Sequence, residues 1–308
     1  MKKIISAILL AGCVLGCTAC GGSAADTNTP AGEQGGELTL AEQYYALASQ
    51  DRVEDAYYSL LTLSRQGDAK ATELLADFSV GYDTYSYKDK DGVKTEHTFT
   101  YDDKGFMTKK VEKVDKDEKT YEYTYNDKGL VASEKFTNKY GKVTTTAFTY
   151  NDAGVLTSKT LTDPQKNDTV TTYTYNDAGK ITFAESKNKF GDVDTITYTY
   201  DDKNRLTKEE FKYFDGTDEY NEYTYNDDSD LPATMVVKEK DGKKTSYEFY
   251  YDSLGKMLNK IDTNSRGRKN ERKYTYDDKG NLVSETYTYY DGKSESGTYE
   301  GYKVYFKG

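Results

Sequence analysis

A tyrosine that recurs about every 25 residues constrains this chain more than any other feature. Each copy follows an aromatic residue by two positions and precedes Asp or Asn, and glycine usually stands four positions after it. The spacings are 24, 25, 25, 25, 25, 26 and 25 residues. Such regularity indicates an array of one supersecondary unit. We call these residues the anchor tyrosines: Tyr101, Tyr125, Tyr150, Tyr175, Tyr200, Tyr225, Tyr251 and Tyr276.

The residues after each anchor tyrosine predict a β-hairpin. Asn126-Asp127-Lys128-Gly129 suits a type I turn closed by a left-handed glycine, which makes a three-residue loop and pairs Tyr125 with Val131. The same rule pairs the other anchors with Met107, Leu156, Ile181, Leu206, Leu231, Met257 and Leu282. The anchor glycines are Gly105, Gly129, Gly154, Gly179, Gly255 and Gly280, and Asn204 and Ser229 replace glycine in the other two units. Ser229 therefore predicts a less regular corner.

A second turn lies between successive anchors, as at Asp215-Gly216, so each unit holds two strands. Because side chains alternate along a strand, a two-residue loop there keeps Leu206 and Tyr225 on one face. Alternation also places the aromatic residues two positions before the anchors on one face, as a ladder. This ladder comprises Phe99, Tyr123, Phe148, Tyr173, Tyr198, Tyr223, Phe249 and Tyr274. The opposite face carries threonine, lysine and glutamate, which water can cover.

These patterns predict a mainly β fold over residues 79–308. We expect a long antiparallel meander of 25-residue, two-stranded repeats that forms a twisted, curling sheet with the aromatic ladder on its inner side, because open sheets seldom exceed about ten strands without curling. A flat single-layer sheet, wet on both faces, is the alternative.

Apolar residues at steps of three and four predict three short helices within residues 38–78. The run of Ala, Tyr and Leu there is similar to a single tetratricopeptide-like helix pair. One such pair cannot bury its own apolar face. We therefore expect a helical cap on the first hairpins rather than a separate peptide-binding module.

The N-terminal residues read as a secretory signal at 1–19 and a flexible Gly/Ser/Ala/Thr-rich tether at 20–37. Thr18-Ala19-Cys20-Gly21 resembles a bacterial lipoprotein signal, which implies lipid attachment at Cys20, with Cys17 as the alternative. Cys13 leaves too short an apolar run before it. Since all three cysteines lie here, the mature domain has none for a disulfide.

The string Tyr276-Asp277-Asp278-Lys279-Gly280-Asn281-Leu282 resembles the YD repeat of the Rhs and teneurin families. The resemblance implies a continuous, spiralling strip of β-sheet and carries over no catalytic residue. The unit here is longer than is usual in those families.

Composition excludes some functions. Asp and Glu number 53 against 42 Lys and Arg, which argues against nucleic acid as a partner. His97 is the only histidine, the aspartates belong to turns, and no glycine-rich phosphate loop occurs, so we expect neither an enzyme nor a cofactor. Aspartate pairs such as Asp102-Asp103, Asp201-Asp202 and Asp277-Asp278 are the one weak candidate for calcium.

The function that remains is an extracytoplasmic, lipid-anchored surface protein that contacts the membrane through its anchor. Its Tyr/Thr-rich sheet would bind a protein or polysaccharide ligand without catalysis. The alternatives are a passive structural spacer or envelope component, and an adhesin for glycan or cell wall.

Overall fold

The computed structural model describes residues 39–49, 52–227 and 229–307. The chain divides into two compact units, and the division along the sequence falls between Phe78 and Ser79. The predicted signal peptide at 1–19, the tether at 20–37 and the cysteines Cys13, Cys17 and Cys20 lie outside the described residues.

The first unit consists of short helices. They are α1 (Leu40–Ser49), α2 (Val53–Arg65), α3 (Ala69–Leu74) and a 3₁₀ turn, η2 (Leu75–Asp77). Asp68 caps α3, because its side chain accepts a hydrogen bond from the Ala71 amide. Ala56, Leu60 and Leu74 are buried between the helices. Among the described helices, none has the length and hydropathy of a membrane span. The role of this unit as a cap on the hairpins stays a prediction.

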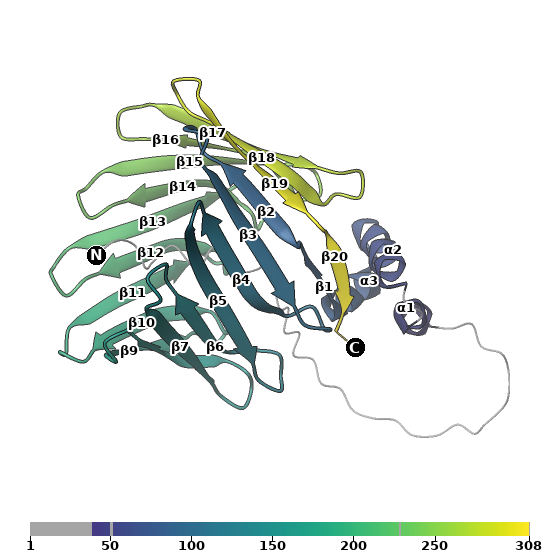
Figure 1. The fold of residues 1–308 in the computed structure, drawn as a ribbon, viewed down its shortest axis with the longest axis horizontal. Coiled ribbons are helices and arrows are strands. Elements are labelled where there is room, and N and C mark those ends of the chain that lie inside the picture. Colours follow the sequence, from purple (N-terminus) through teal and green to yellow (C-terminus); the bar gives the residue numbers. More distant parts are fainter. Residues whose placement is uncertain (1–38, 50–51, 228, 308) are drawn as a thin grey trace, which may run out of the picture. The chain divides into compact units, whose positions relative to one another are not determined.

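In the second unit, eighteen antiparallel strands close into a barrel (Figure 1). Each strand pairs with the next in the chain, and β19 pairs with β2. The strands are β2 (Thr84–Lys88), β3 (Lys94–Tyr101), β4 (Met107–Val114), β5 (Asp117–Tyr125), β6 (Val131–Thr137), β7 (Val143–Tyr150), β8 (Leu156–Thr162), β9 (Asp168–Tyr175), β10 (Ile181–Asn188), β11 (Val193–Tyr200), β12 (Leu206–Lys212), β13 (Asp218–Tyr225), β14 (Pro232–Lys238), β15 (Lys244–Tyr251), β16 (Met257–Thr263), β17 (Lys269–Tyr276), β18 (Leu282–Thr288) and β19 (Ser294–Glu300). Two further strands, β1 (Phe78–Gly81) and β20 (Lys303–Phe306), form a separate two-stranded sheet.

The prediction of an open, curling sheet is therefore wrong. The barrel closes because β19 and β2, from opposite ends of the repeat array, form an antiparallel pair like the strand pair of each of the eight hairpins. In this pair Tyr299 lies opposite Tyr85. The hairpin before it has the same register, since Tyr274 lies opposite Glu285 there. Closure leaves no unpaired edge among the eighteen strands.

The corners after the anchor tyrosines have the predicted geometry. The Gly129 amide donates to the Asn126 carbonyl at 2.9 Å, and Gly129 has a φ of 73°. Seven of the eight predicted anchor pairs are present. The eighth is wrong, because Tyr225 pairs with Pro232 rather than Leu231. This corner, which has Ser229 in place of glycine, is one residue longer and accounts for the 26-residue unit.

The second turns differ from the prediction of a two-residue loop. Lys212 pairs with Asp218, and the Tyr213 amide donates to the Thr217 carbonyl, which leaves a three-residue loop that ends at Gly216. The extra residue is offset by a β-bulge next to each anchor, where the ladder register shifts, as beside Tyr200. The turn between β4 and β5 does have two residues, since Val114 pairs with Asp117, and this explains the 24-residue unit.

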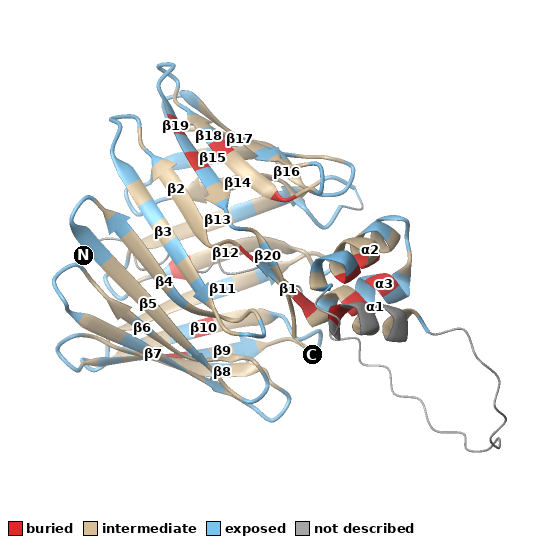
Figure 2. Ribbon diagram, turned by 45° about the vertical axis from the view of Figure 1, so that its right-hand side comes forward, coloured by how far each residue is buried: buried red, intermediate tan, exposed pale blue. Residues whose placement is uncertain are grey.

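Exposure alternates along the strands (Figure 2). In β3, His97, Phe99 and Tyr101 are partly buried, whereas Thr98 and Thr100 are exposed. The aromatic ladder therefore lies on the inner face, where side chains from neighbouring strands converge. Eighteen strands at about 4.8 Å give a barrel roughly 27 Å across, wider than inward side chains fill. Among its described apolar residues, only Ala184 and Phe211 are buried.

Candidate functional site

The inner wall of the barrel pairs each ladder residue with one residue of the next strand. Phenylalanine faces lysine in all three of its occurrences, and tyrosine faces glutamate in three of five. A tyrosine hydroxyl can donate to a carboxylate, whereas the aliphatic part of lysine packs against an apolar ring. The pairs are Phe99 with Lys110, Tyr123 with Glu134, Phe148 with Lys159, Tyr173 with Ala184, Tyr198 with Glu209, Tyr223 with Met235, Phe249 with Lys260, and Tyr274 with Glu285.

Inward carboxylates are hydrogen-bonded by neighbouring side chains. Glu209 accepts from the Tyr223 hydroxyl at 2.7 Å and from the Asn221 amide at 2.9 Å. Burial, and next the negative charge of Glu209, raise the pKa of Tyr223 far above its usual value. The Tyr223 hydroxyl is therefore a hydrogen-bond donor at every physiological pH.

A partly buried three-residue network joins the closing strand pair, β19 with β2, to the hairpin before it. The Tyr85 hydroxyl and the Arg272 guanidinium each donate to Oε1 of Glu285 at 2.7 Å. Glu285 is only 7% exposed. Tyr85 reaches it across Gly297, where a Cβ would lie 2.6 Å from the Tyr85 ring. The network thus ties β2, from the start of the array, to β17 and β18 near its end.

The three lysines that pair with the phenylalanines of the ladder bring positive charge to the inner wall. Burial lowers the pKa of Lys110, Lys159 and Lys260. The Nζ atom of Lys110 lies 5.3 Å from the centre of the Tyr121 ring, and that of Lys260 lies 5.1 Å from the Tyr247 ring. The wall therefore combines aromatic faces with hydrogen-bonding groups of both signs, a lining typical of sites that orient polar ligands.

His97 stacks between the aromatic rings of Tyr85 and Phe99 on the inner wall. Its ring centre lies 5.4 Å from that of Tyr85 and 6.4 Å from that of Phe99. Its Nδ1 atom is buried and has no hydrogen-bond partner among the described residues. Burial, and next the charge of Lys110, lower the pKa of His97. At neutral pH His97 is therefore an uncharged ring in the wall.

The anchor tyrosines, which the sequence singled out, join neighbouring hairpins. The Tyr125 hydroxyl donates to the Met107 carbonyl at 2.8 Å. The other anchors make the same bond, each to the carbonyl of the residue 19 positions earlier. All six anchor glycines have positive φ. The anchor hydroxyls are thus occupied within the fold. This bond was not predicted from the sequence, because it depends on the register between neighbouring hairpins.

The turn aspartates are likewise engaged by the backbone. Oδ1 of Asp102 accepts from the amides of Lys104 and Phe106, and Oδ1 of Asp201 accepts from those of Lys203 and Arg205. In the ranges that the structure describes, no three His, Cys, Asp or Glu residues are grouped as a metal site.

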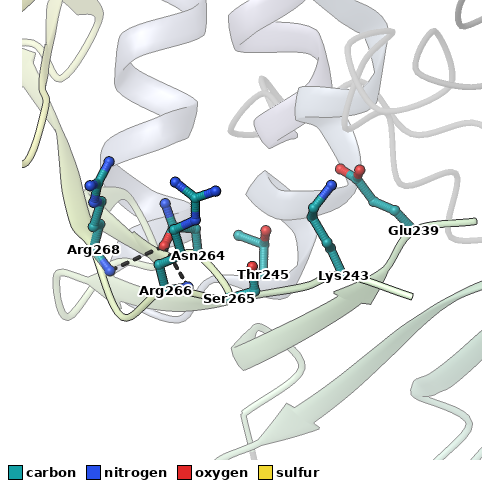
Figure 3. A pocket seen from close by; sticks show the side chains of 7 residues that line it. All are labelled: Glu239, Lys243, Thr245, Asn264, Ser265, Arg266 and Arg268. Atoms are coloured by element: carbon teal, nitrogen blue, oxygen red, sulfur yellow. Dashed lines mark hydrogen bonds between the residues drawn. The ribbon is translucent and has the colours of Figure 1, made fainter. Parts of the chain in front are cut away.

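A second surface is the end of the barrel formed by the nine turns from β2–β3 to β18–β19, which we call the second-turn rim. Four aromatic residues project there and are more than half exposed: Tyr140 (75%), Phe190 (76%), Phe214 (65%) and Tyr290 (54%). Two neighbouring turns enclose a depression of about 220 Å³ that Lys243, Arg266 and Arg268 line together with Glu239 (Figure 3). Sequence reasoning overlooked this rim, although aromatic residues beside turn glycines were a visible signal.

Comparisons with known proteins find remote similarity. No family model matches the sequence, and neither does any curated protein. A porin-like protein from Bacteroides uniformis is 18% identical, with a TM-score of 0.41, over 71% of this chain and 96% of that one. A porin-like protein from Bacteroides vulgatus is 11% identical, with a TM-score of 0.30, over 71% of this chain and 97% of that one. TcdB2-TccC3 without its hypervariable C-terminal region is 15% identical, with a TM-score of 0.35, over 66% of this chain and 12% of that one.

Proposed function

We propose that this chain is a non-catalytic binding protein whose barrel interior holds a polysaccharide. The observation that carries the proposal is the aromatic ladder, whose partly exposed rings line the inner wall at one level. Aromatic faces stack on the apolar faces of sugar rings, and nearby carboxylates, amides and ammonium groups can bond the hydroxyls.

We also propose that the protein is extracytoplasmic and lipid-anchored at Cys20, or alternatively at Cys17. This rests on the resemblance of Thr18–Gly21 to a lipoprotein signal. The resemblance to YD repeats supports the non-catalytic part of the first proposal, because in those families the repeat is structural and carries no catalytic residue.

A passive spacer is the competing function. It is favoured by the fact that inner groups such as Glu209 and Tyr223 already bond each other. The two functions differ in the role of the aromatic ladder. A binding protein needs its rings to contact the ligand, whereas a spacer needs them only for stability.

Equilibrium binding of the purified chain to soluble envelope polysaccharide separates them. Tyr173 and Tyr198 are the ladder residues to replace, since they lie on separate strands and face Ala184 and Glu209. We expect Tyr173→Ala and Tyr198→Ala to weaken saturable binding by about fivefold or more each, because the stacking of one aromatic ring contributes on the order of 1 kcal/mol. Thr174→Ala and Thr199→Ala, on the exposed outer face, are the matched controls. Absence of binding at high micromolar concentration would leave the spacer as the better function.

A further inference from the structure

All four described aromatic residues that are more than half exposed lie on the second-turn rim. The turns themselves do not require them. Tyr140 and Phe190 stand directly before the glycine of their turns, where another turn of the rim has Arg266. Phe214 and Tyr290 stand two positions before the glycine, where that turn has Ser265. Because a polar residue serves each position equally well, the exposed rings need another reason, and a partner that covers them supplies it.

Positive charge accompanies three of these four rings. Lys189 Nζ lies 4.7 Å from the centre of the Phe190 ring, Lys139 Nζ lies 5.2 Å from that of Tyr140, and the Arg268 guanidinium lies 4.4 Å from that of Tyr290. Phe214 lies beside acidic groups instead, because Oδ1 of Asp194 accepts from its amide at 2.9 Å and Asp215 follows it in the chain. Lys240 Nζ lies 3.9 Å from the Asp215 carboxylate. Lys and Arg outnumber Asp and Glu in the turns of this rim, although the whole chain carries a net charge of −11.

The depression on the rim has the chemistry of an anion site. Asn264 Oδ1 accepts from the amides of Arg266 and Arg268 and so fixes this turn, and the side chains of Arg266, Arg268 and Lys243 extend to the same side of it (Figure 3). Lys243 is paired with Asp241, and Arg268 donates to the Tyr290 hydroxyl. Arg266 makes no ion pair within the described part of the chain.

The opposite rim differs in both respects. Its turns follow the anchor tyrosines and contain more Asp than Lys and Arg. Its most exposed large apolar residue is Leu254, at 52%. Only one end of the barrel thus combines exposed rings with cations.

We propose that the second-turn rim docks on the surface of an anionic phospholipid bilayer. The four rings enter the interface between headgroups and acyl chains, the neighbouring cations face lipid phosphates, and the depression beside Arg266 accepts one headgroup phosphate. Aromatic residues and Lys or Arg favour this depth of a membrane, and each cation near an anionic surface adds attraction. The inference is independent of the polysaccharide proposal, which concerns the inner wall.

Vesicle flotation tests it, with the chain from residue 21 onward, which keeps every described residue and has no acyl group. We expect binding to vesicles of phosphatidylcholine mixed with phosphatidylglycerol and little binding to phosphatidylcholine alone. Phe190→Ser and Phe214→Ser should each lower partitioning about tenfold, because each removes a ring from the interface. Arg266→Gln should lower it about fivefold, and added salt should remove that difference.

Leu254→Ser is the control, because Leu254 is an exposed apolar residue (52%) on the other rim, and this variant should partition like the unsubstituted chain. Failure of that chain to bind the anionic vesicles overturns the proposal, and so does an equal loss with Leu254→Ser. Loss of polysaccharide binding in the two phenylalanine variants, with vesicle binding unchanged, would also overturn it and assign the rim to a glycan.

Discussion

The Tyr150 hydroxyl donates a 2.9 Å hydrogen bond to the carbonyl oxygen of Val131, which lies 19 residues earlier in the neighbouring hairpin. This bond joins one repeat to the next, and every anchor tyrosine makes its equivalent. We predict that Tyr150→Phe lowers the free energy of unfolding by about 1 kcal/mol, the usual net contribution of such a bond. Urea denaturation measures the change. Tyr140→Phe, at an exposed turn, is the control, and an equal effect there would contradict the prediction.

Gly297 lets Tyr85 reach Glu285 across the closing strand pair, because a Cβ there would lie 2.6 Å from the Tyr85 ring. We predict that Gly297→Ala displaces Tyr85 from Glu285 and costs about 1–3 kcal/mol of unfolding free energy, as overpacking does. Ser296→Ala, at an exposed neighbouring position, should change it by less than about 0.5 kcal/mol. Thermal denaturation of both variants decides the matter, and similar melting temperatures would disprove the role of Gly297.

Asn151 fixes a corner turn, since its Oδ1 accepts from the Val155 amide at 2.9 Å. We predict that Asn151→Ala costs about 1 kcal/mol of unfolding free energy. Asn151→Asp should be nearly neutral, because aspartate makes the same bond at Asp102 and Asp252. If the two variants were equally destabilised in urea, the side-chain oxygen would not be what holds the turn.

The repeat, its corners and its aromatic face could be predicted because each depends on local chemistry. A glycine with positive φ and an apolar partner six residues after the tyrosine fix each hairpin within one short segment. Closure depends instead on Tyr299 meeting Tyr85 across the whole array. A signal existed: Tyr299 lies 25 residues after Tyr274, and Tyr85 lies 25 residues before Lys110. Gly301 stands where the next anchor tyrosine would be, so the ninth unit lacks the residue by which the others are recognised in the sequence.

The inner wall was predictable only in part. Alternation places the ladder correctly, but a bulge beside each anchor changes which residues of the returning strand face inward. Without the bulge, Lys110 and Glu134 would be assigned to the outer face. The correspondence of phenylalanine with lysine and of tyrosine with glutamate was present in the sequence, and it becomes visible only once the register is known.

His97 gives the barrel a dependence on pH that one substitution can isolate. Burial and the charge of Lys110 lower its pKa below the ordinary 6.5. Between that lowered pKa and 6.5 the unfolded chain binds more protons than the folded chain, so stability falls as the pH drops below about 6.5. His97→Phe keeps a ring between Tyr85 and Phe99 and removes the buried, unpaired Nδ1 atom. We therefore predict a variant that is more stable, by about 1–3 kcal/mol, and less sensitive to pH in this window.

Urea denaturation of both proteins at several pH values measures this. His97 is the only histidine, so the difference between the two stability curves reports its titration, while carboxyl groups contribute equally to both. Thr98→Val, on the exposed outer face of the same strand, is the control and should keep the slope of the unsubstituted chain. If His97→Phe kept that slope as well, the imidazole would titrate alike in the folded and unfolded states, and its burial would have no energetic consequence.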